Sequence, residues 1–159
     1  MLIVRSLGEE FARLHERSVA LVRAVPADRL YWQPPPAAGG PHSIRSCGEH
    51  LLRSAAAVEQ TFGGITVDLW DDPFEWTLPE ALATGAQVVE YLREAEATRL
   101  RAFEFFRSDA DLTREVATPQ GPPRTLFSLM VETLARAAHH EGRAHATFRL
   151  FSGSPLPRA

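Results

Sequence analysis

Apolar residues recur every three or four positions in four separate stretches of the chain. The first stretch runs from Ser6 to the break at Pro26. Its apolar positions are Leu7, Phe11, Leu14, Leu21, Val22 and Val25. In an α-helix this spacing places the apolar side chains on one face, with the charged residues on the other. The pattern therefore predicts a first amphipathic helix that the proline ends.

The second stretch follows a loop rich in proline and glycine, residues 34–41, which cannot continue a helix. Ser43 is suited to cap a helix that begins at Ile44 and runs to about Phe62, where Gly63 and Gly64 predict its end. The predicted buried side of this helix consists of Ile44, Cys47, Leu51, Ala55 and Val58.

Two further stretches complete the pattern. After an aromatic link, the third is predicted to begin at Thr77 or Pro79 and to run to about Phe106. Its apolar positions are Leu82, Val88, Val89, Leu92 and Leu100. A second proline and glycine break, residues 119–123, precedes the fourth stretch, which runs from Thr125 to Phe151 without a proline.

No segment alternates apolar and polar residues as a half-buried strand does, so the pattern predicts an all-α fold. Four long amphipathic helices indicate a four-helix bundle with at least one long crossover connection. With 159 residues, 45% of them hydrophobic, the chain is long enough to bury a core and is expected to form a single domain over residues 1–159.

The composition indicates which kinds of partner and which compartment to expect. The formal net charge is −3 and the arginines are spread along the chain, so we expect no direct contact with nucleic acid. No run approaches the roughly 18 apolar residues of a membrane span, and the apolar N-terminus is too short for a signal peptide. The single cysteine, Cys47, excludes an internal disulfide and suits a reducing compartment. A cytoplasmic protein is the expectation.

The candidate chemistry lies with two histidines. At roughly 100° per residue, His140 in the fourth stretch falls on the same side as the apolar and small residues. His139 falls at the edge of that side and His145 on the opposite face. Arg136 lies one turn before His140 on nearly the same face, and His50 lies on the second predicted helix. In a bundle, His50 and His140 can meet in the interior.

Three segments of the chain resemble the DinB-like superfamily of four-helix bundles, which are also described as metal-dependent hydrolases. They are Leu-Tyr-Trp-Gln-Pro at 30–34, Ser-Ile-Arg-Ser-Cys-Gly-Glu-His-Leu at 43–51, and His-His-Glu-Gly-Arg at 139–143. They look like the family's segment after helix 1, its capped helix 2 with the first histidine, and its His-His-Arg-Gly-Gln signature in helix 4. The resemblance covers nearly the whole chain.

The resemblance implies a divalent ion, usually nickel or zinc, held by one histidine on helix 2 and two histidines four apart on helix 4. His50 matches the first of these ligands and His140 the last. The position one turn before His140 holds Arg136, whose guanidinium cannot ligate a cation. Arg143 also stands where the family usually has glutamine. The metal triad that the family implies is therefore incomplete in this chain.

Two histidines alone hold a divalent ion poorly. Glu132, His139 and His15 are candidates for a third ligand, although none has the required spacing. Two interpretations stay open: His50 and His140 line a divalent site that a further ligand completes, or His50 is a hydrogen-bonded histidine of the core.

Arg136 has two interpretations. In the structural one, it pairs with Glu132 or Glu49 and fills the space that a metal would occupy. In the functional one, its planar guanidinium binds the carboxylate or phosphate of a ligand.

Cys47 lies one turn before His50, and the pair is either a nucleophilic thiol with its base or, as we favour, a small buried filler beside a histidine. Glu141 and His145 lie four residues apart and are expected to be a solvated pair rather than a catalytic one.

The family resemblance implies an enzyme, either a metal-dependent hydrolase or a transferase of a low-molecular-weight thiol such as bacillithiol, mycothiol or glutathione. His50 and His140 would then ligate an ion that lowers the pKa of a bound water or thiol. The alternative is a non-catalytic small-ligand or stress-response bundle that has lost its metal, with Arg136 occupying the site or binding an anion. A structural homodimer is also left open, because a self-association face cannot be told from a core face here.

Overall fold

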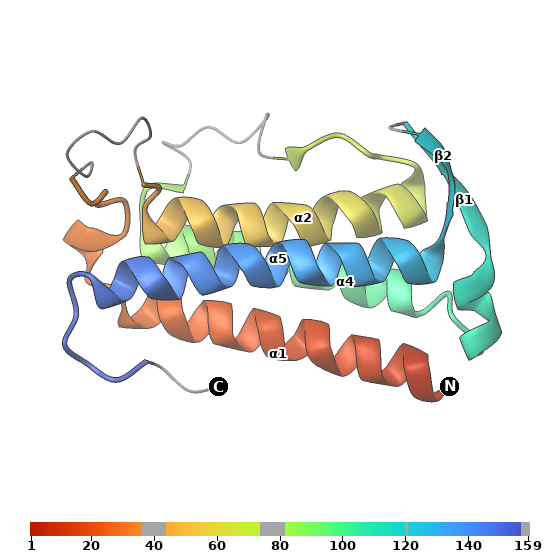
Figure 1. Ribbon diagram of the computed structural model, residues 1–159, viewed down its shortest axis with the longest axis horizontal. Helices are drawn as coiled ribbons and strands as arrows, with labels where there is room; N and C mark the ends of the chain where they lie inside the picture. The colour runs from red at the N-terminus through yellow and green to blue at the C-terminus, as the bar shows by residue number, and fades with distance from the viewer. Residues whose placement is uncertain (36–43, 74–81, 120, 157–159) are drawn as a thin grey trace.

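The structure, a computed structural model, describes residues 1–35, 44–73, 82–119 and 121–156. In these residues the chain forms four long α-helices and one short sheet of two strands. The helices are α1 (Leu2–Ala24), α2 (Cys47–Val67), α4 (Gly85–Phe103) and α5 (Leu126–Arg149). They lie side by side with their axes roughly along one direction (Figure 1). The prediction of a mostly helical chain is confirmed.

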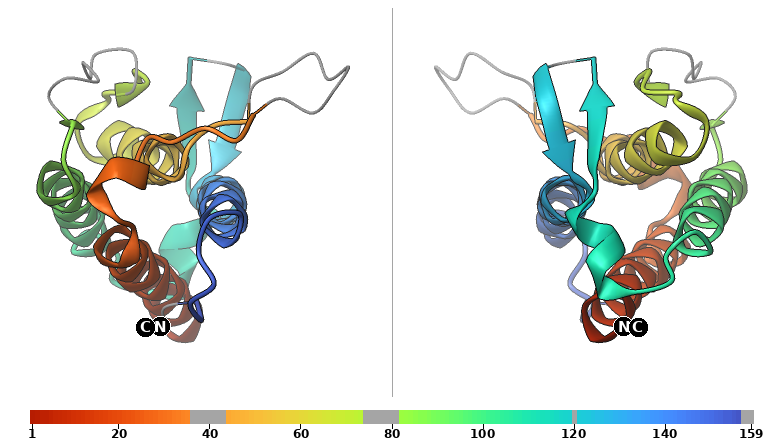
Figure 2. Two further views of the ribbon diagram at one scale, coloured as in Figure 1. Left: turned by 90° about the vertical axis from the view of Figure 1, so that its left-hand side faces the viewer. Right: turned by 90° about the vertical axis from the view of Figure 1, so that its right-hand side faces the viewer.

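Each of the four helices packs against two neighbours around a shared interior. α2 packs against both α4 and α5, and α1 packs against the same two helices, so α1 and α2 lie diagonally opposite each other (Figure 2). α1 and α5 run in one direction, whereas α2 and α4 run in the other (Figure 1). α2 ends at the opposite end of the fold from the start of α4 (Figure 1).

α1 begins at Leu2, four residues before its predicted start at Ser6. A distant side chain caps its first turn, since the carboxylate of Asp109 accepts hydrogen bonds from the backbone N–H groups of Leu2 at 2.8 Å and Val4 at 2.9 Å. These N–H groups have no partner within the helix itself. The extra turn therefore depends on a tertiary contact that local sequence does not reveal.

α2 begins later than predicted. Ser43 lies outside the described residues, and the cap is Ser46, whose hydroxyl accepts a hydrogen bond from the N–H of Glu49. The Glu49 carboxylate in turn accepts the N–H of Ser46 at 2.8 Å, which completes a capping box. Ile44, predicted to be buried in this helix, precedes it and is exposed.

α2 also ends later than predicted, because Gly63 and Gly64 continue the helix. A Cβ atom on Gly64 would lie 2.3 Å from the ring of Trp70, and one on Gly63 would lie 3.3 Å from the carbonyl oxygen of Leu69. The helix ends at Val67, and its C-cap Asp68 adopts the left-handed conformation at φ 56°. The two glycines thus allow the chain to fold back onto α2 instead of stopping the helix.

α4 begins at Gly85, where Thr84 and Gln87 form a second capping box. The predicted starts at positions 77 and 79 lie outside the described residues. The helix ends at Phe103, three residues before its predicted end at position 106. Leu100 was expected on the buried side but is 51% exposed, whereas the other predicted apolar positions of this stretch are buried.

Two short antiparallel strands, β1 (Glu115–Thr118) and β2 (Gly121–Thr125), show that the prediction of no strand is wrong. Glu115 pairs with Thr125, and Val116 pairs with Arg124. The strands are too short and too polar to show an alternating apolar pattern. β2 carries two prolines, which a strand tolerates at the edge of a sheet. The pair lies at the end of the fold where α5 begins (Figure 1).

α5 follows its prediction closely, and Thr125 caps it by accepting a hydrogen bond from the N–H of Ser128. The buried apolar residues form two clusters along the helices. One cluster includes Leu21, Leu51, Leu92 and Phe148, and the other includes Phe11, Phe62, Leu126 and Met130. Within the described ranges, none of the helices has the length and apolar character needed to cross a membrane.

Candidate functional site

Buried hydrogen bonds join α2 to α5 on both sides of the two histidines. The Sγ atom of Cys47 donates to the carbonyl oxygen of Ala144 over 3.2 Å, and the Oγ atom of Ser54 donates to the carbonyl oxygen of Ala137 over 2.9 Å. Helix residues three or four apart share a face. The two bonds therefore bracket position 50 on α2 and position 140 on α5, and bring these positions face to face.

His50 and His140 meet between these two bonds. Their ring centroids lie 5.8 Å apart, and the ring planes are inclined by 33°. His50 is only 3% exposed, and His140 is partly buried. The Nδ1 atoms of both rings are buried and have no hydrogen-bond partner among the described residues. The structure thus brings together the two histidines that the sequence singled out.

Burial keeps both imidazoles neutral at physiological pH. It lowers the pKa of His140 to about 4, and the nearby His50 contributes to this shift. Burial also lowers the pKa of His50, with further contributions from the positive charges of Arg143 and Arg45. A neutral imidazole carries a lone pair on one ring nitrogen. This is the form that ligates a metal ion or accepts a hydrogen bond.

A polar pocket of about 120 Å³ opens beside His140. Arg53 and Asp72 line it together with Arg136, which is exposed and lies one turn before His140 on α5. The Nη2 atom of Arg136 donates to the side-chain oxygen of Gln60 over 3.2 Å. The pocket therefore places one imidazole of the pair beside two guanidinium groups and one carboxylate.

The predicted ion pair of Arg136 with Glu132 or Glu49 is wrong. The carboxylate of Glu132 forms an ion pair with Arg124 of β2, and Glu49 belongs to the capping box of α2. Arg136 is thus held by an uncharged amide, and its charge is not neutralised by either of the expected acidic residues.

No third metal ligand joins the histidine pair in the described part of the chain, where no three His, Cys, Asp or Glu side chains are grouped to hold a metal ion. Glu132 is engaged by Arg124. His139 is exposed, and its ring lies 5.6 Å from that of His140 at an angle of 69°. Adjacent residues of a helix point about 100° apart, so His139 and His140 do not share a face.

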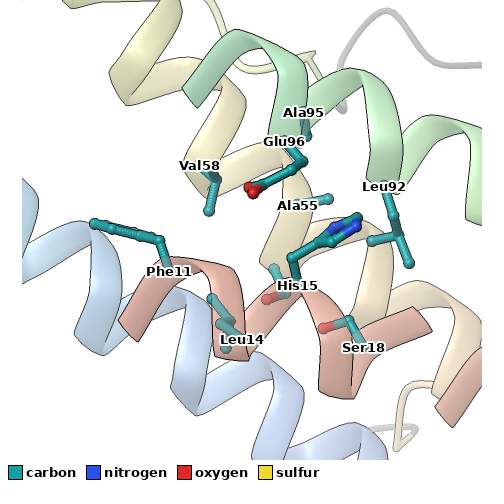
Figure 3. A pocket seen from close by; sticks show the side chains of 10 residues that line it. Phe11, Leu14, His15, Ser18, Ala55, Val58, Leu92, Ala95 and Glu96 are labelled. Atoms are coloured by element: carbon teal, nitrogen blue, oxygen red, sulfur yellow. The ribbon is translucent and has the colours of Figure 1, made fainter. Parts of the chain in front are cut away.

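His15 lies in a different pocket, between α1, α2 and α4 (Figure 3). Its ring and the carboxylate of Glu96 enter this pocket from α1 and α4, among mainly apolar side chains. Glu96 accepts two hydrogen bonds from the guanidinium of Arg99, which is only 4% exposed. Burial lowers the pKa of His15, and the charge of Glu96 opposes that shift. His15 is thus part of a separate polar cluster.

The expectation of a solvated pair at Glu141 and His145 is wrong. Glu141 is buried, and its carboxylate accepts hydrogen bonds from Arg17 of α1 at 2.9 and 2.8 Å. The Nδ1 atom of His145 lies 3.0 Å from the main-chain oxygen of Glu141. α1 covers this face of α5, and α2 covers another. The face under α1 is buried but polar, so the pattern of apolar residues in the sequence does not reveal it.

Cys47 is completely buried, and burial raises the pKa of its thiol to about 12. A thiol in this state is not ionised at physiological pH and is a poor nucleophile. Its observed contact is the hydrogen bond to α5 described above. The structure therefore favours the interpretation of Cys47 as a small buried residue that positions the helices.

Arg53 is a pocket residue that was not predicted from the sequence. This residue lies one turn after His50 on α2 and lines the pocket beside His140. Its spacing of three from His50 was a usable signal, because residues three apart lie on neighbouring parts of a helix surface. Arg17 was missed as well, since its buried partner Glu141 was expected to be solvated.

A scan of the sequence against protein-family models finds no match, and a search of curated proteins also finds none.

Proposed function

We propose that this chain is a DinB-like enzyme, either a metal-dependent hydrolase or a transferase of a low-molecular-weight thiol, with His50 and His140 as ligands of one divalent ion. The observation that carries the proposal is the pair of neutral imidazoles from α2 and α5, which face each other with both Nδ1 atoms unpaired. A buried polar atom without a partner is unfavourable unless another group completes it. A nickel or zinc ion would do so.

The residues present fit a divalent ion in chemical type and protonation state, because histidine nitrogen is a common ligand of zinc and nickel. The set is incomplete in number. Catalytic sites of this kind use three protein ligands and keep one position open. The described residues supply two histidines and place Arg136 at the turn where the family has a further histidine. The remaining positions are left to solvent and substrate.

An ion bound here would lower the pKa of a coordinated water or thiol. The residues of the chain itself supply the binding of the substrate. Arg53 and Arg136 line the pocket beside His140. Guanidinium groups form strong hydrogen bonds with carboxylates and phosphates. We therefore assign an anionic small molecule to this pocket, with its charged group toward Arg136 and its reacting group toward the histidines.

A second candidate is a metal-free bundle, such as a small-ligand or stress-response protein, that binds an anion at the same place. It is supported by the arginine at the metal-ligand turn. The charges of Arg143, Arg45 and Arg53 lower the pKa of His50 and that of Glu49 raises it, so arginines outnumber acidic groups among the charges that act on this ring. A positive field opposes a cation and attracts an anion. In this case Arg136 is the principal anion-binding residue.

Calorimetric titration with nickel tests the first candidate. The parent protein is expected to bind the ion, and His140→Ala is expected to abolish binding because it removes one of the two ligands. His145→Ala is the matched control on α5, since the Nδ1 atom of His145 is already engaged by the main chain of Glu141. Nickel binding retained by His140→Ala would show that the ion lies elsewhere.

Titration with inorganic phosphate tests the second candidate on the same protein without metal. Arg136→Gln is expected to weaken phosphate binding by about tenfold, as the loss of one charge-assisted hydrogen bond predicts. Arg124→Gln is the control, because Arg124 is paired with Glu132 and does not line the pocket beside His140. Equal phosphate affinity in the parent and in Arg136→Gln would exclude Arg136 as the anion-binding residue.

A further inference from the structure

Residues of α2, α5 and both strands line a second pocket, which we call the hairpin pocket because Thr118 of β1 and Pro122 of β2 border it. Its volume is about 300 Å³, at the lower end of the roughly 300 to 1,000 Å³ that is typical of small-molecule sites. Gln60 and Arg136 line both this pocket and the pocket beside His140, whereas His140 lines only the latter. Arg136 therefore lies where the two pockets meet.

The charged residues of the hairpin pocket leave one guanidinium for a ligand. The carboxylate of Glu132 forms an ion pair with Arg124, so these two charges compensate each other. Arg136 has no ion pair within the part of the chain that the structure describes, and its Nη2 atom donates to the side chain of Gln60 and to the carbonyl oxygen of Ala57. A guanidinium carries five N–H donors. Further N–H groups of Arg136 thus remain for an anion.

Trp70 forms an aromatic wall of the same pocket. Its ring lies directly against α2, because a Cβ atom on Gly64 would be only 2.3 Å from it. The indole Nε1 atom donates to the carboxylate of Asp68 over 2.8 Å, and the main-chain oxygen of Trp70 accepts a hydrogen bond from Gln60 over 2.9 Å. The ring is therefore held in place before any ligand binds, which lowers the entropic cost of binding to it.

Gln60 connects this aromatic wall to the unpaired charge. Its Nε2 atom donates to the main chain of Trp70, and its Oε1 atom accepts a hydrogen bond from Arg136 over 3.2 Å. Both polar atoms of the amide are thus used between these two residues. An anion-binding group and an aromatic ring therefore border one pocket at a fixed separation.

We propose that the hairpin pocket binds the flat ring of an anionic ligand whose charged group is held by Arg136. This inference rests on the anion-binding role of Arg136 proposed above and adds the aromatic part of the molecule. A flat ring can pack against the indole, and the apolar side chains of Leu129 and Pro122 line the rest of its surroundings. The hydroxyl groups of Thr61 and Thr133 also line the pocket, but they are hydrogen-bonded to each other at 2.7 Å and require no polar group on the ring.

Calorimetric titration of the full chain without metal compares three probes that share one charged group. Inorganic phosphate has no ring, phenyl phosphate has a flat ring, and cyclohexyl phosphate has a saturated ring of similar size. At a pH where all three are dianions, we expect phenyl phosphate to bind about tenfold more tightly than inorganic phosphate and about fivefold more tightly than cyclohexyl phosphate.

The failure of the ring site differs from the failure of the anion site. If inorganic phosphate binds and phenyl phosphate binds no more tightly than either of the other probes, the ring site is overturned and the anion-binding role of Arg136 stands. If none of the three probes binds, both are overturned.

Two substitutions separate the parts of the site. Trp70→Leu should remove the preference for phenyl phosphate over cyclohexyl phosphate, because the aromatic wall is lost. Arg136→Gln should weaken the binding of all three probes by a similar factor, because it acts on the charged group that they share. A preference for phenyl phosphate that survives in folded Trp70→Leu would overturn the assignment of the wall.

Fluorescence quenching locates the ring in a variant that keeps an aromatic side chain at position 70. The nitroaromatic ring of 4-nitrophenyl phosphate quenches a tryptophan that it contacts, so we expect saturable quenching in the parent protein and the loss of most of it in Trp70→Phe. Trp32→Phe is the control, because the ring of Trp32 packs on that of Phe151, 5.4 Å away, and does not line the hairpin pocket. Saturable quenching that Trp70→Phe retains in full would contradict the proposed position of the ring.

Discussion

The imidazole rings of His50 and His140 lie 5.8 Å apart, centroid to centroid, although they belong to helices that are distant in the sequence. The hydrogen bonds of Cys47 and Ser54 to the main chain of α5 enclose this contact on both sides. The register of α2 on α5 is therefore set by polar groups that flank the site. The neighbouring residues hold the two helices together, and the Nδ1 atoms of the two histidines have no hydrogen-bond partner among the described residues.

Arg136→His is predicted to raise the affinity for nickel at least tenfold. Arg136 and His140 are one turn apart on α5 and line the same pocket, so a histidine at 136 would add a third nitrogen ligand beside His50 and His140. The measurement is calorimetric titration with nickel. Arg136→Gln removes the charge without adding a ligand and should gain much less. If Arg136→His binds nickel no better than Arg136→Gln, position 136 does not face the ion.

Gly48→Ala is predicted to lower the free energy of unfolding by about 2 kcal/mol. An added Cβ atom would lie 2.6 Å from the ring of Tyr31 and 3.0 Å from the carbonyl oxygen of Leu30. Gly142→Ala is the control. Nothing lies within 4 Å of its added Cβ atom, so the higher helix propensity of alanine should stabilise α5 by roughly 0.5 to 1 kcal/mol. Urea denaturation measures the free energy of unfolding of both variants. An unchanged free energy of unfolding in Gly48→Ala would show that the segment before α2 does not pack as described.

Arg17→Ala is predicted to destabilise the protein by about 2 kcal/mol, because it leaves the buried carboxylate of Glu141 without its two hydrogen bonds. Adding Glu141→Gln to Arg17→Ala should recover part of this loss, since the second substitution removes the unpaired charge. A double-mutant cycle by urea denaturation measures the coupling. Strictly additive effects of the two substitutions would argue against the ion pair.

Stability is predicted to fall as the pH decreases from about 6.5 toward 4. The pKa of His140 in the folded chain is about 4, lowered from 6.5, so between these values the unfolded chain binds a proton that the folded chain does not. Above pH 6.5 the histidine is neutral in both states and does not affect the free energy of unfolding. Below pH 6.5 protonation stabilises the unfolded chain alone, so the free energy of unfolding falls with the pH. His140→Asn should therefore reduce the loss of stability between pH 7 and 4.5 by ~2 kcal/mol. Parallel pH profiles for the parent and His140→Asn would contradict the lowered pKa.

The sequence predicts the helices well where apolar spacing and local caps determine them. α5 agrees with its prediction to within a few residues because Thr125 caps it locally and no proline interrupts it. The start of α1 could not be predicted, since it depends on Asp109 from a distant part of the chain. Gly63 and Gly64 were misread as a stop, because their role is to admit a close contact with the following turn.

The candidate site was predicted in part. The inward direction of His140 and the position of His50 follow from helix geometry, and the structure brings the two rings together. The burial of Glu141 was missed, because a polar side chain in a second interface leaves no apolar signature. The ion pair expected for Arg136 was wrong, because Glu132 pairs with Arg124 instead. Arg124 belongs to β2, a strand that was not predicted from the sequence.

Elemental analysis of untagged, purified protein, repeated after dialysis against excess nickel or zinc, tests the proposed metal site most directly. The expected result is about one ion per chain in the parent and none in His140→Ala, as a single site with both histidines as ligands requires. A parent protein that retains no more metal than His140→Ala would contradict the metal-dependent function and leave the anion-binding alternative.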